Sequence, residues 1–218
     1  MSGKKKIAVI LSGCGVYDGT EIQEATLTML AIARAGAQYE IFAPDIQQAQ
    51  VINHLNREIM QESRNVLVES ARIARGRISD LKDYIASDFD ALVFPGGFGA
   101  VKNLCTFAFD GPDCSVNPDV EKAVKDTVTA GKPIGALCIS PALITKILKN
   151  VEVTIGQDAD TASAIEMMGG MHKITTHGEV IVDKKYKIAT TPCYMLNATI
   201  DQIADGAENI IATLLEMD

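Results

Sequence analysis

The sequence has no long hydrophobic run, no C-x-x-C pair and no cluster of histidines. A membrane-spanning helix needs about 20 apolar residues, and no stretch approaches that length. The N-terminus also has no signal-peptide hydrophobic region. We therefore expect no membrane partner and a cytoplasmic location. The cysteines are odd in number and widely spaced, and three scattered histidines do not suggest a metal cluster, so we expect neither structural disulfides nor a metal site. The five cysteines are Cys14, Cys105, Cys114, Cys138 and Cys193.

Length and charge narrow the class of protein further. The chain has 218 residues, enough for one α/β domain with a substantial core. Its 47% hydrophobic and 22% charged residues are typical of an ordinary globular protein. The formal net charge of −8 argues against nucleic acid or an anionic membrane as a partner. No repeat, low-complexity tract or linker divides the chain, so we expect a single domain over residues 1–218.

Strand-like and helix-like patterns alternate along the chain, which indicates an α/β fold with a mostly parallel sheet and helices on both faces. The least regular segments, 44–62 and 106–118, are expected to be excursions over the surface. Strands are predicted over 7–11, 39–43, 91–94, 134–137, 151–155, 180–183 and 187–190. Helices are predicted over 21–35, 63–75, 120–130, 141–148, 160–168 and 198–216. The apolar face of the last helix is predicted to contain Ile200, Ile203, Ala207, Ile210, Ile211 and Leu214.

Cys138 follows an apolar, strand-like run and leads directly into a helical pattern. Small residues, Ala136 and Ser140, stand two positions to either side of it. This layout is typical of a nucleophile elbow, a sharp strand-to-helix turn that holds a nucleophile at the end of a sheet. The helix N-terminus behind the turn is expected to lower the thiol pKa. A free cysteine is more often a small buried hydrophobe, but the elbow favours a reactive thiol at Cys138.

Three turns rich in glycine or cysteine follow predicted strands, at 12–15, 95–99 and 138–140. Ligands of open α/β sheets bind outside the carboxyl ends of the strands, so we expect a site where these turns converge. A thiolate that adds to a carbonyl carbon produces an oxyanion, which needs hydrogen-bond donors. We expect the backbone N–H groups of Gly97 and Ile139 to form that oxyanion hole.

Several residues are candidates to support the thiol. Glu24 and Glu21, in the first turns after the first strand, are placed to act as a base, although an amphipathic helix carries exposed glutamates anyway. His172 and His177 are the other acid–base candidates, against the ordinary alternative of surface histidines. Gly96 and Cys14 are candidates to line the site, and Cys14 fits equally well as a residue that fills space. The remaining three cysteines are interpreted as structural or incidental.

Two of these motifs together resemble a known superfamily. Residues 94–99 (FPGGFG) and 134–141 (IGALCISP) are similar to the PfpI / Parkinsonism-associated deglycase superfamily, which has the class I glutamine amidotransferase-like fold. Residues 11–19 (LSGCGVYDG), 62–67 (ESRNVL) and 95–100 (PGGFGA) resemble its ElbB-type glyoxalase branch, linked by name to isoprenoid biosynthesis. The resemblance covers nearly the whole chain, from Lys6 to the last helix.

The resemblance implies a flavodoxin-like three-layer sandwich, usually dimeric, with a cysteine nucleophile and no cofactor. It places the glutamate that is hydrogen-bonded to the cysteine at Glu24 and the third residue, a histidine, at His172. The usual surroundings of that histidine are not recognisable here. The turn also reads Cys-Ile-Ser-Pro instead of the Cys-x-Gly-Pro of many relatives, a change that still fits an elbow.

The activity implied by the resemblance is that of a glyoxalase III-like hydro-lyase of low to moderate activity, which converts glyoxal to glycolate or methylglyoxal to lactate. The alternative is a redox-responsive regulatory or chaperone-like homodimer that uses the same cysteine and is tied to isoprenoid biosynthesis. Glutaminase activity ranks third. The pair His177 and Glu179 precedes the late hairpin, whereas the family's histidine follows it, and residues 190–194 contain no histidine.

Overall fold

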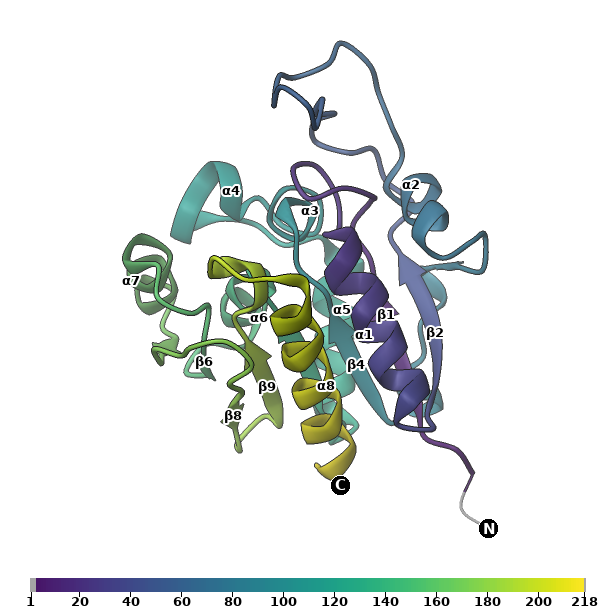
Figure 1. Cartoon of the computed structure of the whole chain (residues 1–218), viewed down its shortest axis with the longest axis vertical. Coiled ribbons are helices and arrows are strands. Elements are labelled where there is room, and N and C mark those ends of the chain that lie inside the picture. The colour runs from purple at the N-terminus through teal and green to yellow at the C-terminus, as the bar shows by residue number, and fades with distance from the viewer. Residues whose placement is uncertain (1–2, 218) are drawn as a thin grey trace.

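A computed structural model describes residues 3–217 and contains a seven-stranded sheet of order β3-β2-β1-β4-β5-β9-β8 (Figure 1). All neighbouring strands in it pair in parallel except β8 and β9, which form an antiparallel hairpin. A further parallel pair joins β6 to β7. The strands are β1 (Lys6–Ile10), β2 (Gln38–Ala43), β3 (Ser79–Asp80), β4 (Ala91–Phe94), β5 (Ile134–Leu137), β6 (Glu152–Val153), β7 (Met171–His172), β8 (Ile181–Asp183) and β9 (Ile188–Thr191).

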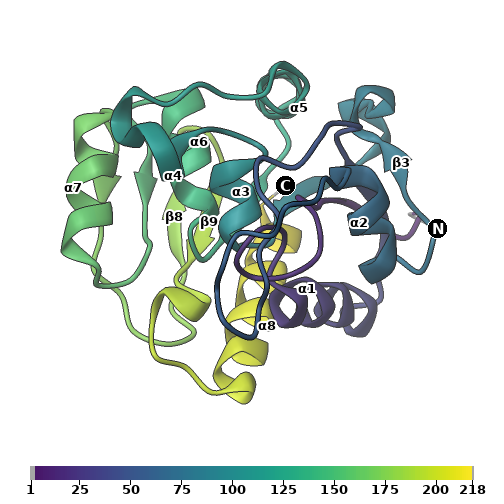
Figure 2. The same cartoon turned by 90° about the horizontal axis from the view of Figure 1, so that it is seen from above.

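Helices cover both faces of the sheet, so the predicted three-layer α/β sandwich is confirmed. Seen from above, α1 and α8 lie on one side of the sheet and α5 and α6 on the other (Figure 2). No helix within residues 3–217 is both long and apolar enough to cross a membrane. The helices are α1 (Ile22–Arg34), α2 (Val66–Ile73), α3 (Phe98–Lys102), α4 (Phe107–Asp110), α5 (Pro118–Thr129), α6 (Ser140–Leu148), α7 (Ala159–Met167) and α8 (Ile200–Glu216).

The central strand β1 shows why the strands read as continuous apolar runs. Ile7 and Val9 pack into the core beneath α1 and α8, whereas Ala8 and Ile10 pack into the core beneath α5 and α6. Successive side chains of a strand point to opposite faces, so a strand that is covered on both faces needs apolar residues at every position. Because the strands themselves are apolar, polar residues are found in the turns that follow them. In a parallel sheet these turns gather at the edge formed by the carboxyl ends of the strands.

Helix starts follow side-chain caps that the sequence supplies. Asn117 accepts the N–H groups of Asp119 and Val120 at the start of α5. Thr199 begins α8 with a capping box that it forms with Gln202. Such caps satisfy backbone N–H groups that have no partner within the helix. They explain why the predicted helix starts lie within a few residues of the observed ones.

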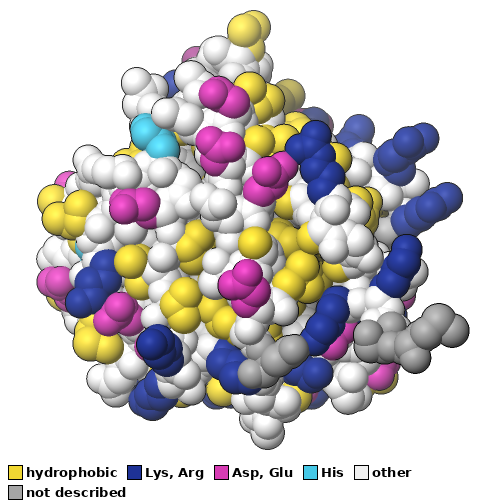
Figure 3. All heavy atoms as spheres, turned by 60° about the horizontal axis from the view of Figure 1, so that its bottom comes forward, with side chains coloured by type: hydrophobic (Ala, Val, Ile, Leu, Met, Phe, Trp, Pro, Cys, Tyr) yellow, Lys and Arg dark blue, Asp and Glu magenta, His cyan; other side chains and the backbone are white. Residues whose placement is uncertain are grey.

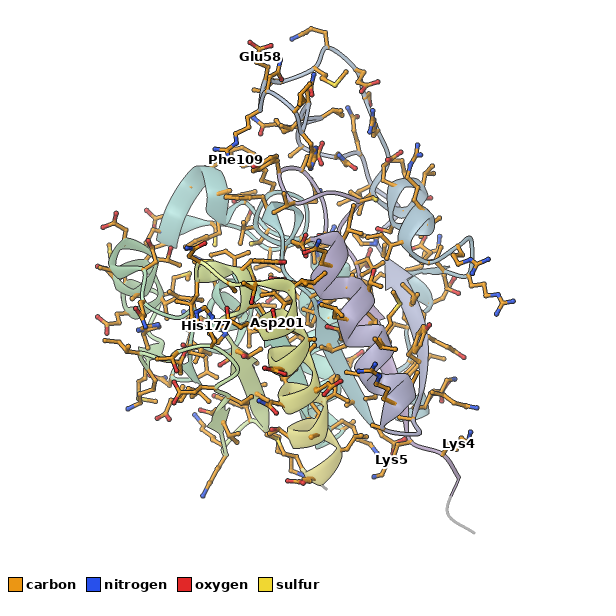
Figure 4. All side chains as sticks on the ribbon, in the orientation of Figure 1. Lys4, Lys5, Glu58, Phe109, His177 and Asp201 are labelled. Atoms are coloured by element: carbon orange, nitrogen blue, oxygen red, sulfur yellow. The ribbon has the colours of Figure 1, made fainter. Side chains whose placement is uncertain are left out.

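Some predictions about individual segments were wrong. The expected strand over 151–155 is limited to β6, and Ile200 is 53% exposed, so it does not belong to the buried face of α8. That helix buries its apolar side from Ile203 onward. Segment 44–62 forms an arm that projects from the body of the molecule, with Glu58 at its outer part (Figure 4). Segment 106–118 contains α4, which the sequence pattern did not reveal.

Candidate active site

Three turns meet at the carboxyl edge of the sheet, because β1, β4 and β5 are neighbours and run in parallel. The hydroxyl of Ser140 donates to the carbonyl oxygen of Pro95 at 2.9 Å, which joins the turn after β5 to the turn after β4. The N–H of Glu21 donates to the carbonyl oxygen of Gly96 at 2.9 Å, which joins the start of α1 to the same turn. These contacts assemble the site that the strand-end rule predicts.

Cys138 has the backbone conformation of an elbow. Its φ of +59° lies in the left-handed region, which costs a non-glycine residue about 1–2 kcal/mol. The N–H of Cys138 is held by the carbonyl oxygen of Thr191 at 3.0 Å, and α6 begins two residues later at Ser140. The residue is only 7% exposed. The fold therefore maintains local strain in order to hold this thiol at the strand end.

Glu24 lies against the thiol with no exposed surface. Its Oε2 accepts the N–H of Gly96 at 2.9 Å, and its Oε1 accepts the N–H of Tyr194 at 3.2 Å. A side-chain hydrogen bond joins this carboxyl group to Cys138. Two backbone donors thus fix the carboxyl group, so that it faces the sulfur without depending on a mobile side chain.

Burial, and after it the charge of the neighbouring Glu21, raise the pKa of Glu24 to about 7. The N–H donors from Tyr194 and Gly96 and the Cys138 thiol oppose this change. A carboxyl group with this pKa is about half ionised at neutral pH and exchanges protons readily in both directions. Glu24 therefore has the protonation behaviour of a general acid–base group.

The pKa of the Cys138 thiol is raised well above its usual value, first by burial and then by the charge of Glu24. The N–H groups of Gly97 and Ile139 lower it, in the direction expected from the helix N-terminus. The expectation of a net lowering of the thiol pKa was wrong. Burial destabilises the thiolate more than the two N–H donors stabilise it. The thiol thus keeps its proton until Glu24 accepts it.

Glycine at position 96 is required by the close approach of these groups. A Cβ atom there would lie 2.3 Å from the Cβ of Cys138 and 2.6 Å from Oε2 of Glu24. Gly97 combines a φ of +98° with a position at which a Cβ would lie 2.3 Å from the backbone nitrogen of Glu21. These two glycines allow backbone N–H groups to reach the carboxyl group and the sulfur.

Glu21 and Cys14, the other predicted site residues near α1, differ in how they relate to the Cys138–Glu24 pair. Glu21 begins α1, where its carboxylate accepts the N–H of Glu24 at 2.6 Å, and burial raises the pKa of Glu21. Burial also raises the pKa of Cys14, whose nearest charges belong to Glu69 and Arg72 of α2. The structure therefore brings Glu21 to the site, whereas the charges that act most strongly on Cys14 belong to α2 and none belongs to Glu24 or Cys138.

His172 lies in β7, away from the three turns. Its Nε2 is 3.4 Å from the backbone nitrogen of Ile155, and burial lowers its pKa. Among the contacts described for residues 3–217, none joins His172 to Cys138 or Glu24. The resemblance placed the family's histidine at His172, but the described contacts do not bring this residue to the thiol.

Sequence reasoning missed the turn after β9. There the N–H of Tyr194 holds Glu24, and the buried thiol of Cys193 has its pKa raised by burial and by the charges of Glu24 and Cys138. Because β9 pairs with β5, its carboxyl end had to lie beside the elbow. That rule could have identified this turn, had the order of the strands been known.

Access to the thiol is limited. One hollow, of about 440 Å³, is formed by the arm residues 47–51 and 59–63, and another lies at the opposite end around Lys132 and Asp90. Cys138 lines neither of them. The thiol and Glu24 therefore meet in a nearly closed part of the structure.

Within residues 3–217, no group of three His, Cys, Asp or Glu side chains is arranged to hold a metal ion.

Comparison with known proteins assigns the family. No protein-family model matches the chain. It is 48% identical over 222 residues to the human protein named glutamine amidotransferase-like class 1 domain-containing protein 3, mitochondrial, across 97% of this chain and 83% of that protein. The chain belongs to the glutamine amidotransferase-like class 1 family. The relative's name gives a mitochondrial location, so a cytoplasmic location is not established for this family member.

Solved structures extend the comparison. A crystal structure of an Ehrlichia chaffeensis isoprenoid biosynthesis protein with an amidotransferase-like domain has a TM-score of 0.90 and 39% identity, across 96% of this chain and 98% of that chain. Glyoxalase III from Candida albicans, at 14% identity, has a TM-score of 0.61 across 96% and 97% of the two chains, and so shares the fold alone. Other neighbours are named DJ-1/ThiJ/PfpI proteins. The predicted class I glutamine amidotransferase-like family and flavodoxin-like fold are confirmed.

Proposed function

We propose that this family member is a cofactor-independent, glyoxalase-like enzyme that converts glyoxal to glycolate or methylglyoxal to lactate. The observation that carries the proposal is the contact between the Cys138 thiol and Glu24, a buried carboxyl group with a pKa of about 7. A thiol, an adjacent carboxyl group with a pKa near neutrality and two backbone donors are the groups that thiol addition to an aldehyde requires.

The first step forms a bond between sulfur and carbon. Glu24 takes the thiol proton as the sulfur of Cys138 attacks the aldehyde carbon, and the carbonyl oxygen becomes an alkoxide. The N–H groups of Gly97 and Ile139, which already favour negative charge on the sulfur, stabilise this oxyanion. Loss of one such donor typically costs about 10²–10³ in rate.

Proton transfers then oxidise the carbon that is bound to sulfur and reduce the neighbouring carbonyl carbon. Protonated Glu24 returns its proton to the alkoxide, which gives a neutral hemithioacetal. The regenerated carboxylate removes the C–H proton and delivers it to the oxygen of the second carbonyl, which gives an enediol. It then takes the hydroxyl proton of the first carbon and delivers it to the second carbon. The product is a thioester on Cys138, and water cleaves it to release the 2-hydroxy acid and the thiol. One carboxyl group with a pKa near neutrality performs each transfer, so His172 is not needed.

Crowding around the thiol supports a small substrate. Gly96 leaves no room for a side chain between Cys138 and Glu24, and the thiol is almost completely buried. A dicarbonyl with two or three carbon atoms is the smallest electrophile that meets the chemistry described. The activity named for the Candida albicans protein agrees with this proposal, although at 14% identity that similarity extends only to the fold.

The redox-responsive alternative at Cys138 is weaker. Oxidation by peroxide proceeds through the thiolate, and both burial and Glu24 raise the pKa of the Cys138 thiol. A tie to isoprenoid biosynthesis, suggested by the name of the Ehrlichia protein, belongs to this alternative. We therefore rank the enzyme first. A cytoplasmic location is a separate part of the proposal.

A homodimer completes the proposal. Ile22 and Leu30 of α1 and Ile200 of α8 are exposed. In Figure 3, hydrophobic side chains gather on the face turned to the viewer, among acidic and basic ones. Clustered apolar side chains at a surface are typical of contacts between protein chains. The matching faces of two copies would cover these side chains, and analytical ultracentrifugation measures whether they do.

Steady-state kinetics with glyoxal, methylglyoxal and glutamine tests the function. We expect glycolate and lactate to form, no ammonia to be released from glutamine, and Cys138→Ala to abolish both products. Cys14→Ser serves as the matched control, because it removes a thiol that has no described contact with Cys138 or Glu24 and should retain the wild-type rate. Undiminished glycolate production by Cys138→Ala would rule out the proposed chemistry.

A further inference from the structure

Two other cysteines are brought together by an antiparallel contact outside the active site. A bridge pairs Cys105 with Val116, and the N–H of Thr106 donates to the carbonyl oxygen of Ser115 at 2.9 Å. Alternate residues of an extended segment share a face, so Cys114 lies on the same side as Val116, diagonally across from Cys105. The bridge therefore places the two cysteines on one face of the two adjoining segments.

The two thiols are in direct contact. A side-chain hydrogen bond joins Cys105 to Cys114, and Sγ of Cys105 also lies 3.5 Å from the carbonyl oxygen of Ala100 in α3. The contact with Cys105 lowers the pKa of Cys114, and the nearby Lys146 ammonium acts in the same direction. The same contact raises the pKa of Cys105. The pair thus contains one thiol that ionises easily and one that keeps its proton.

Lys146 is fixed beside this pair by the backbone. Its Nζ donates to the carbonyl oxygen of Pro112 at 2.7 Å, in the segment between the two cysteines. The thiols themselves are each 3% exposed. The segment that separates them is open to solvent, and Phe109 of α4 is 50% exposed at the surface (Figure 4). The two cysteines therefore lie beneath a short, exposed segment of the surface.

We propose that Cys105 and Cys114 are a peroxide-reactive dithiol that closes to an intramolecular disulfide, independently of Cys138. The oxidant is a hydroperoxide, of which hydrogen peroxide is the smallest example. Cys114 is the thiol that is oxidised first, and Cys105 is the thiol that resolves the oxidised product. The proposal differs from oxidation of the active-site cysteine, because neither Cys105 nor Cys114 takes part in the thiol–carboxyl pair.

The chemistry balances in two steps. The Cys114 thiolate attacks one oxygen of the peroxide, the O–O bond breaks, and hydroxide leaves while the sulfur is oxidised to a sulfenic acid. The sulfur of Cys105 then attacks the sulfur of Cys114. The S–S bond forms, the S–O bond breaks, and the departing hydroxide leaves as water with the proton of Cys105. Overall, two thiols and one hydrogen peroxide give one disulfide and two waters.

Cys114 should react before the catalytic thiol. The Lys146 ammonium and the Cys105 thiol favour its thiolate, whereas burial and the Glu24 carboxylate disfavour the thiolate of Cys138. Peroxide reactivity follows thiolate character. Cys114 is therefore expected to be oxidised before Cys138, because the charges around its sulfur favour the thiolate.

Mass spectrometry of the native, full-length protein tests the proposal. After limited hydrogen peroxide, free thiols are alkylated and the protein is digested with trypsin, which places Cys105 and Cys114 together in the peptide 103–122. We expect this peptide to be lighter than the dithiol form by two hydrogen atoms, to carry no alkyl group, and to return to the dithiol form with dithiothreitol. We also expect this change before any oxidation of the peptide that contains Cys138.

Variants distinguish the roles of the two thiols. Cys105→Ser should leave a sulfenic or sulfinic acid on Cys114, whereas Cys114→Ser should leave Cys105 alkylated and unoxidised. Cys14→Ser is the matched control and should form the disulfide at the wild-type rate. Circular dichroism melting curves confirm that each variant is folded. Complete alkylation of both thiols in the wild type while Cys138 is already oxidised would overturn the proposal, as would oxidation of Cys105 in Cys114→Ser.

Discussion

Replacing Glu24 with glutamine removes an ionisable group from the core and keeps the shape of the side chain. The carboxyl group is completely buried, and its pKa rises from 4.5 to about 7. At about 1.4 kcal/mol per pH unit, this rise corresponds to about 3 kcal/mol of unfavourable free energy for the ionised form in the folded protein. The substitution therefore changes how stability depends on pH as well as the rate of the reaction.

The sign follows from proton binding in the two states. Between pH 4.5 and about 7, the unfolded chain loses the Glu24 proton while the folded protein keeps it. Rising pH therefore favours the unfolded state, and the wild type loses about 3 kcal/mol of stability from this group across that window. Above pH 7 no further loss occurs. Glu24→Gln lacks this dependence, although one of its N–H donors loses an acceptor at every pH.

Urea denaturation at several pH values measures this difference. We expect the stability of the wild type relative to Glu24→Gln to fall by about 3 kcal/mol between pH 4.5 and 7.5. Glu216→Gln, which removes an exposed carboxyl group from α8, is the control for loss of a negative charge and should run parallel to the wild type. Parallel curves for the wild type and Glu24→Gln would refute a raised pKa at Glu24. In glycolate assays, Glu24→Gln should lose about 10²–10⁴ in kcat/KM, the usual contribution of a general base.

Three further substitutions have expected outcomes. Gly96→Ala places a Cβ 2.3 Å from that of Cys138 and should cost more stability in thermal unfolding than Gly206→Ala in α8, whose Cβ would meet nothing closer than 3.4 Å; equal costs would contradict the close packing. His172→Ala should keep kcat for glyoxal within about twofold, because no described contact links it to the thiol; a large loss of kcat would restore the family histidine. Ser140→Ala removes the bond to Pro95 and should cost about 1 kcal/mol in denaturant unfolding and also lower kcat; a variant with unchanged kcat would show that this link does not position the elbow.

The fold and the elbow were predictable because periodicity and turn chemistry are local properties. The runs over β4 and β5 appear in the sequence with the same bounds that the structure has. Cys138 stood out because small neighbours and a following helix are visible in sequence. The thiol pKa was not predictable in the same way, because it depends on burial and on a carboxyl group from α1.

Contacts between segments far apart in the chain account for the other differences. Tyr194 reaches Glu24 only because β9 pairs with β5, a strand order that no local pattern encodes. Cys105 and Cys114 meet through an isolated bridge and do not have the spacing of a known redox motif. The position of His172 was inferred from the resemblance, and the structure places it in a short pair of strands away from the thiol.

The central claim is that Cys138 becomes covalently bound to the substrate during turnover. Acid quenching of the protein with excess glyoxal, followed by mass spectrometry of the tryptic peptides, measures this directly. A hemithioacetal reverts on quenching, whereas a thioester survives acid and is cleaved by hydroxylamine. The account predicts an acid-stable addition of one glyoxal to the peptide that contains Cys138, and its absence in Cys138→Ala. Glycolate formation without any such addition to Cys138 would contradict it.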